Sequence, residues 1–511
     1  MRMAAVTRQL VVFPTLVVAL LPVVSVVLGN SALLEVNSSL TRRPTAVLLG
    51  VAIGLVLILR CVTSELRVRA AGVSIWLLTL WLYPALYRWV WPLNAVSEGV
   101  AATAYLVAAS ALALWLAPRM GRPENQLLVN GLAIGVVVAT SVRLAVMTHM
   151  WETPPWSASV DRILGVHERS LLLSEQAPDI YYIVLDGMSR LDTLRGVYGI
   201  EVGAFAYGLA ARGFSVAAQS SSNYSQTHLS LASALNMTYL DDLAHSMGDS
   251  ADRTPLRILV QRSRAISRLR DAGYEFVMIG SDYSLTITHP QADRCDCALV
   301  SGLSELESAL IDRSPFRVLS LENHTFGAHS RKVLHSFDSI AALRRGTRPM
   351  LVFAHILSPH PPFVLNKDGR ARWPTHRFSF RDGNHYPGRS DEYVEGYRGQ
   401  AQFIMARVLR LIDEIRVERP GAVIILHGDH GSGLRLDHES VERSDAAERL
   451  SIFTALRLPY ADTSVPADLT PVNVLRLVFN RALGAQYEML PNRRFMSSWE
   501  RPYRLIPARQ P

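Results

Sequence analysis

The sequence predicts an α/β protein in which five membrane-spanning helices precede a three-layered α/β/α sandwich with a mostly parallel sheet. The first observation is that apolar residues are concentrated near the N-terminus, in runs of about 20 residues. The second is that short continuous apolar runs alternate with helical stretches in the rest of the chain, as in parallel sheets covered by helices. The expected domains are a transmembrane domain over 1–150, a juxtamembrane linker over 151–178 and an extracytoplasmic domain over 179–511.

The membrane-spanning helices are predicted from five apolar runs, at roughly 9–29, 44–61, 70–91, 98–117 and 126–147. Each run is close to the ~20 residues that a helix needs to cross a bilayer. Because four similar runs follow the first, the first is interpreted as a retained span and not as a cleaved signal peptide. The runs hold no cluster of Asp, Glu or His, so they are expected to anchor the protein rather than to transport a solute.

The charge distribution excludes a globally basic nucleic-acid-binding protein and orients the spans. Residues 1–150 hold eleven arginines against four glutamates, which is +7 of the formal charge of +8. Arginines near the N-terminus and after the second and fourth spans place those ends in the cytoplasm, with Arg42 and Arg43 as exceptions. The loop 92–97 has neither Lys nor Arg and is placed outside. An odd number of spans then puts residues 151–511 on the outer side.

The sheet is predicted from short apolar runs at 179–187, 274–280, 350–356, 422–431 and 450–459, with helices between them such as 256–272 and 396–417. In a parallel sheet, chemistry collects beyond the carboxyl ends of the strands. Acidic and imidazole side chains occur at these ends, and they are the ligands that divalent metals take.

Asp186 ends the first of these runs, and Asp429 with His430 follows the fourth, within a Gly-Asp-His-Gly turn. Taken alone, each pattern is more often a simple turn with a capping aspartate. Two acids at the ends of two parallel strands, however, would repel each other unless a cation lay between them. The pair therefore favours a metal site.

The segment 220–240 runs from a loop rich in Ser and Asn into an apolar helix, with Thr227 at the expected helix start. One interpretation is that Thr227 caps the helix, a role that Ser, Thr and Asn all fill well. The other is that its hydroxyl is a nucleophile, favoured by the helix dipole and by an adjacent metal. Ser225 and Ser222 are rivals for that role by composition alone.

His355 and His360 lie in and just after the run 350–356, and Pro361 and Pro362 make the following loop rigid. Packed or surface histidines are one interpretation. The functional interpretation is that they contact the substrate, or donate a proton beside the metal.

Four motifs in this order, LDG (185–187), NYSQTHLSLAS (223–233), HILSPHPPF (355–363) and HGDHG (427–431), resemble the sulfatase-like branch of the alkaline phosphatase superfamily. With five spans ahead of them, the chain resembles membrane enzymes of the lipoteichoic acid synthase and phosphoethanolamine transferase types. The tract 470–484 is similar to the helix that closes such domains.

The resemblance implies one divalent metal ion, Mn or Zn with Mg as a third candidate. Its implied ligands are Asp186, Thr227, Asp429 and His430, and Thr227 is the implied nucleophile. His360 matches the family's histidine near the substrate phosphate, and His355 is expected beside it in substrate binding.

The resemblance also implies a membrane-anchored phosphotransferase that moves a phospho-headgroup from a phospholipid to an envelope glycan or lipid, through a phospho-threonine intermediate. Its expected location is a bacterial inner membrane, with the catalytic domain periplasmic or extracellular. The alternatives are a metal-dependent phosphatase or phosphodiesterase with the same ligands, and a non-catalytic binding ectodomain.

Two departures from the family bear on these expectations. True sulfatases carry x-Pro-x-Arg after the nucleophile, whereas His-Leu-Ser-Leu follows Thr227, so sulfate ester hydrolysis by that route is not expected. Phosphoethanolamine transferases are usually rich in disulfides, whereas this chain has three cysteines. Of these, Cys295 and Cys297 are either two loop thiols or one bridge.

Overall fold

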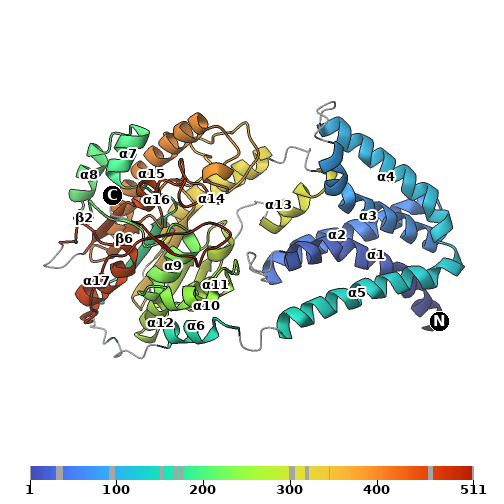
Figure 1. The fold of residues 1–511 in the computed structure, drawn as a ribbon, viewed down its shortest axis with the longest axis horizontal. Helices are drawn as coiled ribbons and strands as arrows, with labels where there is room; N and C mark the ends of the chain where they lie inside the picture. Colours follow the sequence, from blue (N-terminus) through green and yellow to red (C-terminus); the bar gives the residue numbers. More distant parts are fainter. Residues whose placement is uncertain are drawn as a thin grey trace. The chain divides into compact units, whose positions relative to one another are not determined.

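The computed structural model describes residues 2–29, 38–90, 98–149, 154–165, 171, 177–297, 305–316, 322–344, 346–458 and 464–508. The chain divides into two compact units (Figure 1). The first comprises Met1–Pro154 with Leu303–Leu321, and the second comprises Pro155–Gly302 with Glu322–Pro511.

The first unit contains five long apolar helices, which confirms the predicted spans. They are α1 (Arg2–Gly29), α2 (Ser38–Ile58), α3 (Leu66–Val90), α4 (Glu98–Met120) and α5 (Gln126–His149), with short 3-10 turns η1 (Leu59–Cys61) and η3 (Pro123–Asn125). Each contains a segment of 18 to 22 residues that is long and apolar enough to cross a membrane. The loop 92–97, on which part of the predicted orientation depends, lies outside the described residues.

One helix of the first unit comes from much later in the chain. In α13 (Glu305–Asp312), Leu306 and Leu310 are buried in a cluster with Val23 and Val26 of α1. These leucines lie four residues apart and therefore share one face of the helix. The expected boundary near residue 150 does not anticipate this segment.

The second unit is built on a seven-stranded sheet with the order β2-β7-β6-β1-β5-β3-β4. The strands are β1 (Ile180–Leu185), β2 (Phe214–Val216), β3 (Glu275–Ile279), β4 (Arg294–Asp296), β5 (Met350–Ile356), β6 (Val423–His427) and β7 (Thr454–Arg457). The pairings β1–β5, β1–β6, β3–β5 and β3–β4 are parallel, whereas β7 runs antiparallel to β6 and β2. The prediction of a mostly parallel sheet is confirmed. The two unpredicted strands, β2 and β4, have three residues each, too few for a visible apolar pattern.

Helices cover both faces of this sheet, giving the predicted α/β/α layers (Figure 1). One layer holds α6 (Ser157–Leu164), α9 (Thr227–Asn236), α10 (Asp241–Met247), α11 (Thr254–Gln261), α12 (Arg264–Asp271) and α17 (Pro471–Leu483). The other holds α7 (Leu191–Tyr198), α8 (Gly203–Ala210), α14 (Glu322–Ala342) and α15 (Ser390–Glu418). The remaining elements are α16 (Ala446–Leu450), η4 (Ser284–Thr286), η6 (Gly383–His385), β8 (Phe495–Met496) and β9 (Ile506–Pro507).

Two predicted helical segments differ from the structure in detail. The segment 256–272 forms α11 and α12 instead of one helix, because Ser263 between them has an extended ψ of 140°. The predicted linker contains the short helix α6, while 166–170 and 172–176 lie outside the described residues.

The central strand β1 explains how the two layers are held on one sheet. All six of its residues are buried, and alternate side chains enter opposite cores. Ile180, Tyr182 and Val184 face one core, whereas Tyr181, Ile183 and Leu185 face the other. Because β5 and β6 flank β1 in parallel, the carboxyl ends of three buried strands meet at one edge.

Candidate active site

The carboxyl ends of β1, β5 and β6 bring together residues that lie far apart in the sequence. Asp186 directly follows β1, and His355 lies within β5 in register with Val184. Asp429 and His430 follow β6. All four side chains are 4% exposed or less. The sheet therefore creates a buried cluster of two carboxylates and two imidazoles.

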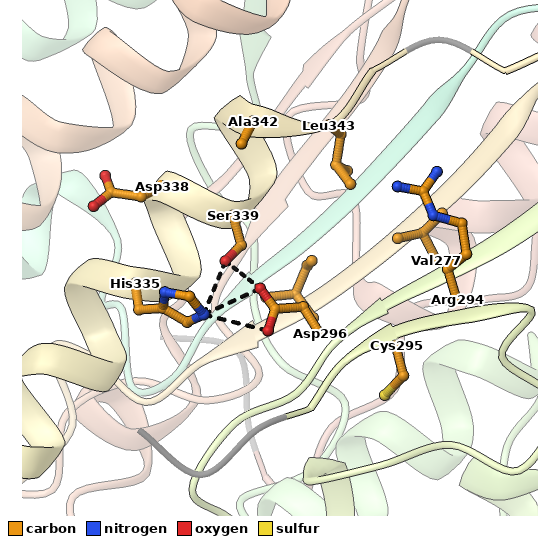
Figure 2. Close-up of a pocket in the computed structure, with 10 residues that line it drawn as sticks. Val277, Arg294, Cys295, Asp296, His335, Asp338, Ser339, Ala342 and Leu343 are labelled. Carbon is orange, nitrogen blue, oxygen red and sulfur yellow. Dashed lines mark hydrogen bonds and ion pairs between the residues drawn. The ribbon is translucent and has the colours of Figure 1, made fainter. Parts of the chain in front are cut away.

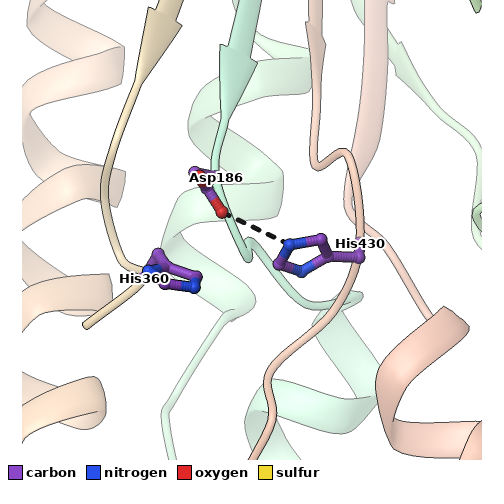
Figure 3. Close-up of side chains that lie close together, drawn as sticks. All are labelled: Asp186, His360 and His430. Atoms are coloured by element: carbon purple, nitrogen blue, oxygen red, sulfur yellow. Dashed lines mark ion pairs between the residues drawn. The ribbon is translucent and has the colours of Figure 1, made fainter. Parts of the chain in front are cut away.

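The side chains of this cluster lie close together, and Figure 3 shows two of them, Asp186 and His430, with the nearby His360. His355 Nε2 lies 3.2 Å from Asp186 Oδ2. His430 Nε2 lies 3.5 Å from Asp186 Oδ1 and 3.3 Å from Asp429 Oδ2. Asp186 with His360 and His430, and Asp186 with His355 and Asp429, form two groups whose ligand atoms all lie within 4.8 Å of one another.

A divalent cation fits the donor atoms of this cluster. Asp186 Oδ1 and Asp429 Oδ2 are buried and have no hydrogen-bond partner. Buried polar atoms without a partner are costly, and carboxylate and imidazole donors are those that Zn²⁺ and Mn²⁺ accept. The other Asp429 oxygen, Oδ1, accepts a hydrogen bond from the backbone N–H of Gly187 at 3.1 Å, which fixes the direction in which Oδ2 points.

The protonation states also suit a cation. His430 Nδ1 donates to the carbonyl of Gly431 at 2.9 Å, so a neutral ring presents the lone pair of Nε2 to the cluster. Burial lowers the pKa of His430, and Arg449 lowers it further. For Asp186, burial alone would raise the pKa, but His360, His355 and His430 outweigh it and hold the pKa below its ordinary value.

Thr227 is the first residue of α9 and faces the cluster. Its Oγ1 lies 3.1 Å from His430 Nε2, and its side chain does not cap the helix. The preceding residue, Gln226, is extended (φ −123°, ψ 137°) and occupies the N-cap position without a side-chain capping bond. The hydroxyl therefore lies at a helix N-terminus, where the dipole favours negative charge on oxygen.

The two rival hydroxyls are bound to other parts of the fold. Ser225 Oγ accepts a hydrogen bond from the backbone N–H of Ser497 at 3.2 Å. Ser222 Oγ contacts the carbonyls of Tyr224 and Asp429, at 2.8 and 2.5 Å. Both serines are buried, whereas Thr227 is half-buried. The geometry distinguishes Thr227 from its rivals, as the motif resemblance does.

His360 lies beside the cluster, with its ring centre 5.9 Å from that of His430. Its Nδ1 donates to the carbonyl of Pro361 at 2.6 Å, so a proton on Nε2 makes the ring cationic. Nε2 lies 3.7 Å from Asp382 Oδ2.

Asp382 is a site residue that the sequence does not reveal. It is 4% exposed, and it accepts hydrogen bonds from Tyr393 Oη and Arg449 Nη1, both at 2.8 Å. Burial would raise its pKa, but His360 and Arg449 lower it to about 2. Asp382 follows no strand, and Asp-Gly in a loop indicates only a turn, so no signal in a single sequence marks it.

The structure brings His355 to the cluster in a position different from that of His360. His355 is 1% exposed, and its Nδ1 lies 2.9 Å from Thr286 Oγ1. The substrate contact predicted for it stays a prediction. His427 is the first residue of the HGDHG motif but points elsewhere: its nitrogens bond Tyr182 Oη and the Gly428 carbonyl, both at 2.8 Å.

A second group of acidic, imidazole and hydroxyl side chains lines a pocket at the β3–β4 edge of the sheet, which we term the edge pocket (Figure 2). The pocket measures about 470 Å³, and Asp296, His335 and Ser339 form its polar wall. His335 Nε2 lies 3.1 Å from Asp296 Oδ2 and 3.2 Å from Ser339 Oγ. Cys295, also in its wall, forms a disulfide with Cys297, which settles the open alternative for these cysteines in favour of one bridge. None of the residues predicted for the active site lines this pocket.

No model of a known protein family matches the chain, and no curated protein matches it. Among solved structures, the chain is similar to the C-terminal periplasmic domain of EcEptC from Escherichia coli, with 14% identity over 67% of this chain and 96% of that one (TM-score 0.40). It is also similar to the lipooligosaccharide phosphoethanolamine transferase EptA of Neisseria meningitidis, with 13% identity over 93% and 95% of the two chains (TM-score 0.39). A third similar structure is the periplasmic domain of the phosphoethanolamine transferase EptC of Campylobacter jejuni, with 9% identity over 62% and 96% (TM-score 0.38).

Proposed function

We propose that this protein is a membrane-anchored, metal-dependent phosphotransferase that moves a phospho-headgroup from a phospholipid to an envelope glycan or lipid. The observation that carries the proposal is the convergence of Thr227 Oγ1 with His430 Nε2, next to carboxylate oxygens that have no partner. A half-buried hydroxyl at a helix N-terminus beside a cation site has the features of an activated nucleophile. The four sequence motifs support the same residues.

The donor ligands proposed for the metal are Asp186, Asp429 and His430, with Thr227 as the fourth. A divalent cation there would favour the Thr227 alkoxide and offset charge on the phosphoryl oxygens. Mn or Zn suits this mixed set of oxygen and nitrogen donors, and Mg is a weaker candidate because imidazole is not its preferred ligand.

In the first half-reaction, Thr227 loses its hydroxyl proton to solvent and its oxygen attacks the phosphorus of the donor. A threonine O–P bond forms, and the P–O bond to diacylglycerol breaks. His360, whose Nε2 faces Asp382, serves as the general acid and donates its Nε2 proton to the departing oxygen. The products are threonine that carries the phospho-headgroup, diacylglycerol and a neutral His360.

In the second half-reaction, His360 acts as the base and the Thr227 oxygen is the leaving group. The neutral His360 takes the proton of an acceptor hydroxyl as that oxygen attacks the phosphorus. The threonine O–P bond breaks, the threonine oxygen regains a proton, and the headgroup is left on the acceptor. Both half-reactions require His360 to hold and release one proton at Nε2, which its fixed Nδ1–H allows.

The five apolar helices support the proposed location in a membrane, where enzyme and lipid donor share one surface. We further propose a bacterial inner membrane with the catalytic unit on the outer side. A reporter fused after Pro511 should be active outside the cytoplasm. Reporter activity in the cytoplasm would contradict this topology.

The second candidate is a phosphatase or phosphodiesterase, in which water replaces the acceptor in the second half-reaction. The same cluster supports both, so the products must distinguish them. The purified protein should be incubated with a headgroup-labelled phospholipid, with and without an acceptor extract. A transferase releases diacylglycerol and labels the acceptor, whereas a hydrolase releases free phospho-headgroup at the same rate without acceptor. Failure to release diacylglycerol in either case would remove both candidates and leave the binding ectodomain.

A further inference from the structure

A buried arginine without a carboxylate partner lies next to the proposed nucleophile. Arg253 is 3% exposed and lies just ahead of α11. Its Nη2 donates to Gln226 Oε1 at 3.1 Å and to the carbonyl of Trp499, and its Nη1 donates to the carbonyl of Ala251 at 3.2 Å. All these acceptors are neutral, and Gln226 directly precedes Thr227.

Two other buried arginines of the α/β unit have the carboxylate partner that Arg253 lacks. Arg449 pairs with Asp382 at 2.8 Å, and Arg419 pairs with Asp179 at 2.6 Å. Among the described residues, no carboxylate oxygen lies within ion-pair distance of Arg253. The neighbouring Asp252 favours its charge from further away, and Arg253 Nε is buried without a hydrogen-bond partner. A buried cation without an opposite charge is costly, and it is expected to persist where a ligand supplies that charge.

An aromatic side chain covers part of Arg253. The Trp499 ring lies over the guanidinium, with 4.1 Å between the guanidinium carbon and the ring centre. Trp499 itself is 37% exposed. A cation–π contact partly offsets the desolvation of the guanidinium but does not neutralise its charge. Binding of a ligand at the guanidinium would require this ring to move.

We propose that Arg253 is an anion-binding residue beside Thr227, covered by Trp499, and that it binds two oxygens of the phosphoryl group of the substrate. The planar guanidinium suits two phosphate oxygens at once, which a lysine does not. The inference deepens the proposed function and rests on it: the substrate class is a phosphate ester whose charge is completed by a cation outside the metal cluster.

Anion binding to the full-length protein in detergent tests this inference without requiring turnover. The probes are inorganic phosphate and dimethyl phosphate, which separate a monoester-like anion from a diester-like one, and binding is measured by calorimetry and by the shift in Tm. We expect the wild-type protein to bind at least one of them. Arg253→Gln should weaken that binding by about tenfold or more. Arg253→Lys keeps the positive charge but loses the planar pair of N–H donors, so it should weaken the binding less.

Two controls separate this role from others. Arg419→Gln breaks a buried ion pair at the opposite end of β1, so it should lower Tm and leave anion affinity unchanged. Thr227→Ala should abolish turnover whatever the role of Arg253, whereas the effect of Arg253→Gln on anion affinity is measured without turnover, so that failure of the nucleophile assignment and failure of the Arg253 assignment have different signatures. Equal anion affinity in wild type and both Arg253 variants, or no binding of either probe by the wild type, would overturn the proposal. If Arg253→Gln does not fold, the anion affinity of Arg253→Lys tests the proposal alone: weaker binding than in wild type supports it, and equal binding contradicts it.

Discussion

The candidate active site and the edge pocket contain the same kinds of side chain but differ in how their polar atoms are satisfied. In the edge pocket, Asp296, His335 and Ser339 bond one another, and His335 and Asp296 are each more than one-third exposed. In the active-site cluster, Asp186 and Asp429 are almost fully buried, yet each keeps one oxygen without a partner. Residue types alone therefore do not identify a site. Buried donor atoms that the fold leaves unpaired do, because a ligand must account for their cost.

The largest effect is expected from the nucleophile. Thr227→Ala should reduce turnover on the order of 10³-fold or more, because no other hydroxyl of the described residues forms a hydrogen bond with His430 Nε2. Ser225→Ala, the matched control, should keep most of the activity, because that hydroxyl bonds the backbone of Ser497. Turnover and Tm should be measured on both variants. A Thr227→Ala enzyme that loses about 1 kcal/mol of stability but keeps near-normal turnover would make the residue a structural one.

The second-largest effect is expected on the affinity for the metal. Asp186→Asn or Asp429→Asn should lower the affinity for Mn or Zn by more than about tenfold while the protein stays folded, because each removes a charged donor from the cluster. Elemental analysis after dialysis, with circular dichroism for the fold, measures this. Asp296→Asn in the edge pocket is the matched control and should leave metal content unchanged. Unchanged metal content in both cluster variants would contradict the assignment of the metal to the active-site cluster.

A smaller effect is expected in the edge pocket itself. Ser339→Ala and His335→Gln should change turnover by no more than about twofold and stability by less than about 1 kcal/mol, because partly exposed polar pairs contribute little. A larger loss of turnover in either variant would show that the edge pocket takes part in the reaction.

His289 extends the comparison to stability. It is a buried histidine whose two ring nitrogens both form hydrogen bonds within the fold. His289 Nε2 donates to the Val260 carbonyl at 3.0 Å, and Nδ1 accepts from Gln291 N at 3.2 Å. Burial lowers the pKa of His289 to about 4, so the unfolded chain binds the proton more tightly. Stability is therefore complete above pH 6.5 and is lost as the pH falls towards 4, by about 2 kcal/mol at pH 5. Denaturant unfolding between pH 7 and 5 should show a shallower loss in His289→Asn than in wild type, and identical slopes would contradict the assignment.

The sequence predicts the layers and most of the cluster because both depend on local patterns. Continuous apolar runs predict buried strands, and parallel strands place Asp186 and Asp429 at one edge. Asp382 and Arg253 could not be predicted, because each is defined by long-range contacts with residues such as Arg449 and Trp499. The antiparallel direction of β7 and the position of α13 also depend on tertiary packing that no periodicity encodes.

Mass spectrometry of the purified protein during reaction with a phospholipid donor tests the central claim most directly. The predicted result is a mass increase on the peptide that contains Thr227, equal to the phospho-headgroup, which disappears when acceptor is added. Fragmentation should place the added mass on Thr227 and not on Ser225 or Ser222. Turnover of the donor with no added mass on this peptide, under conditions that slow the second half-reaction, would contradict the account.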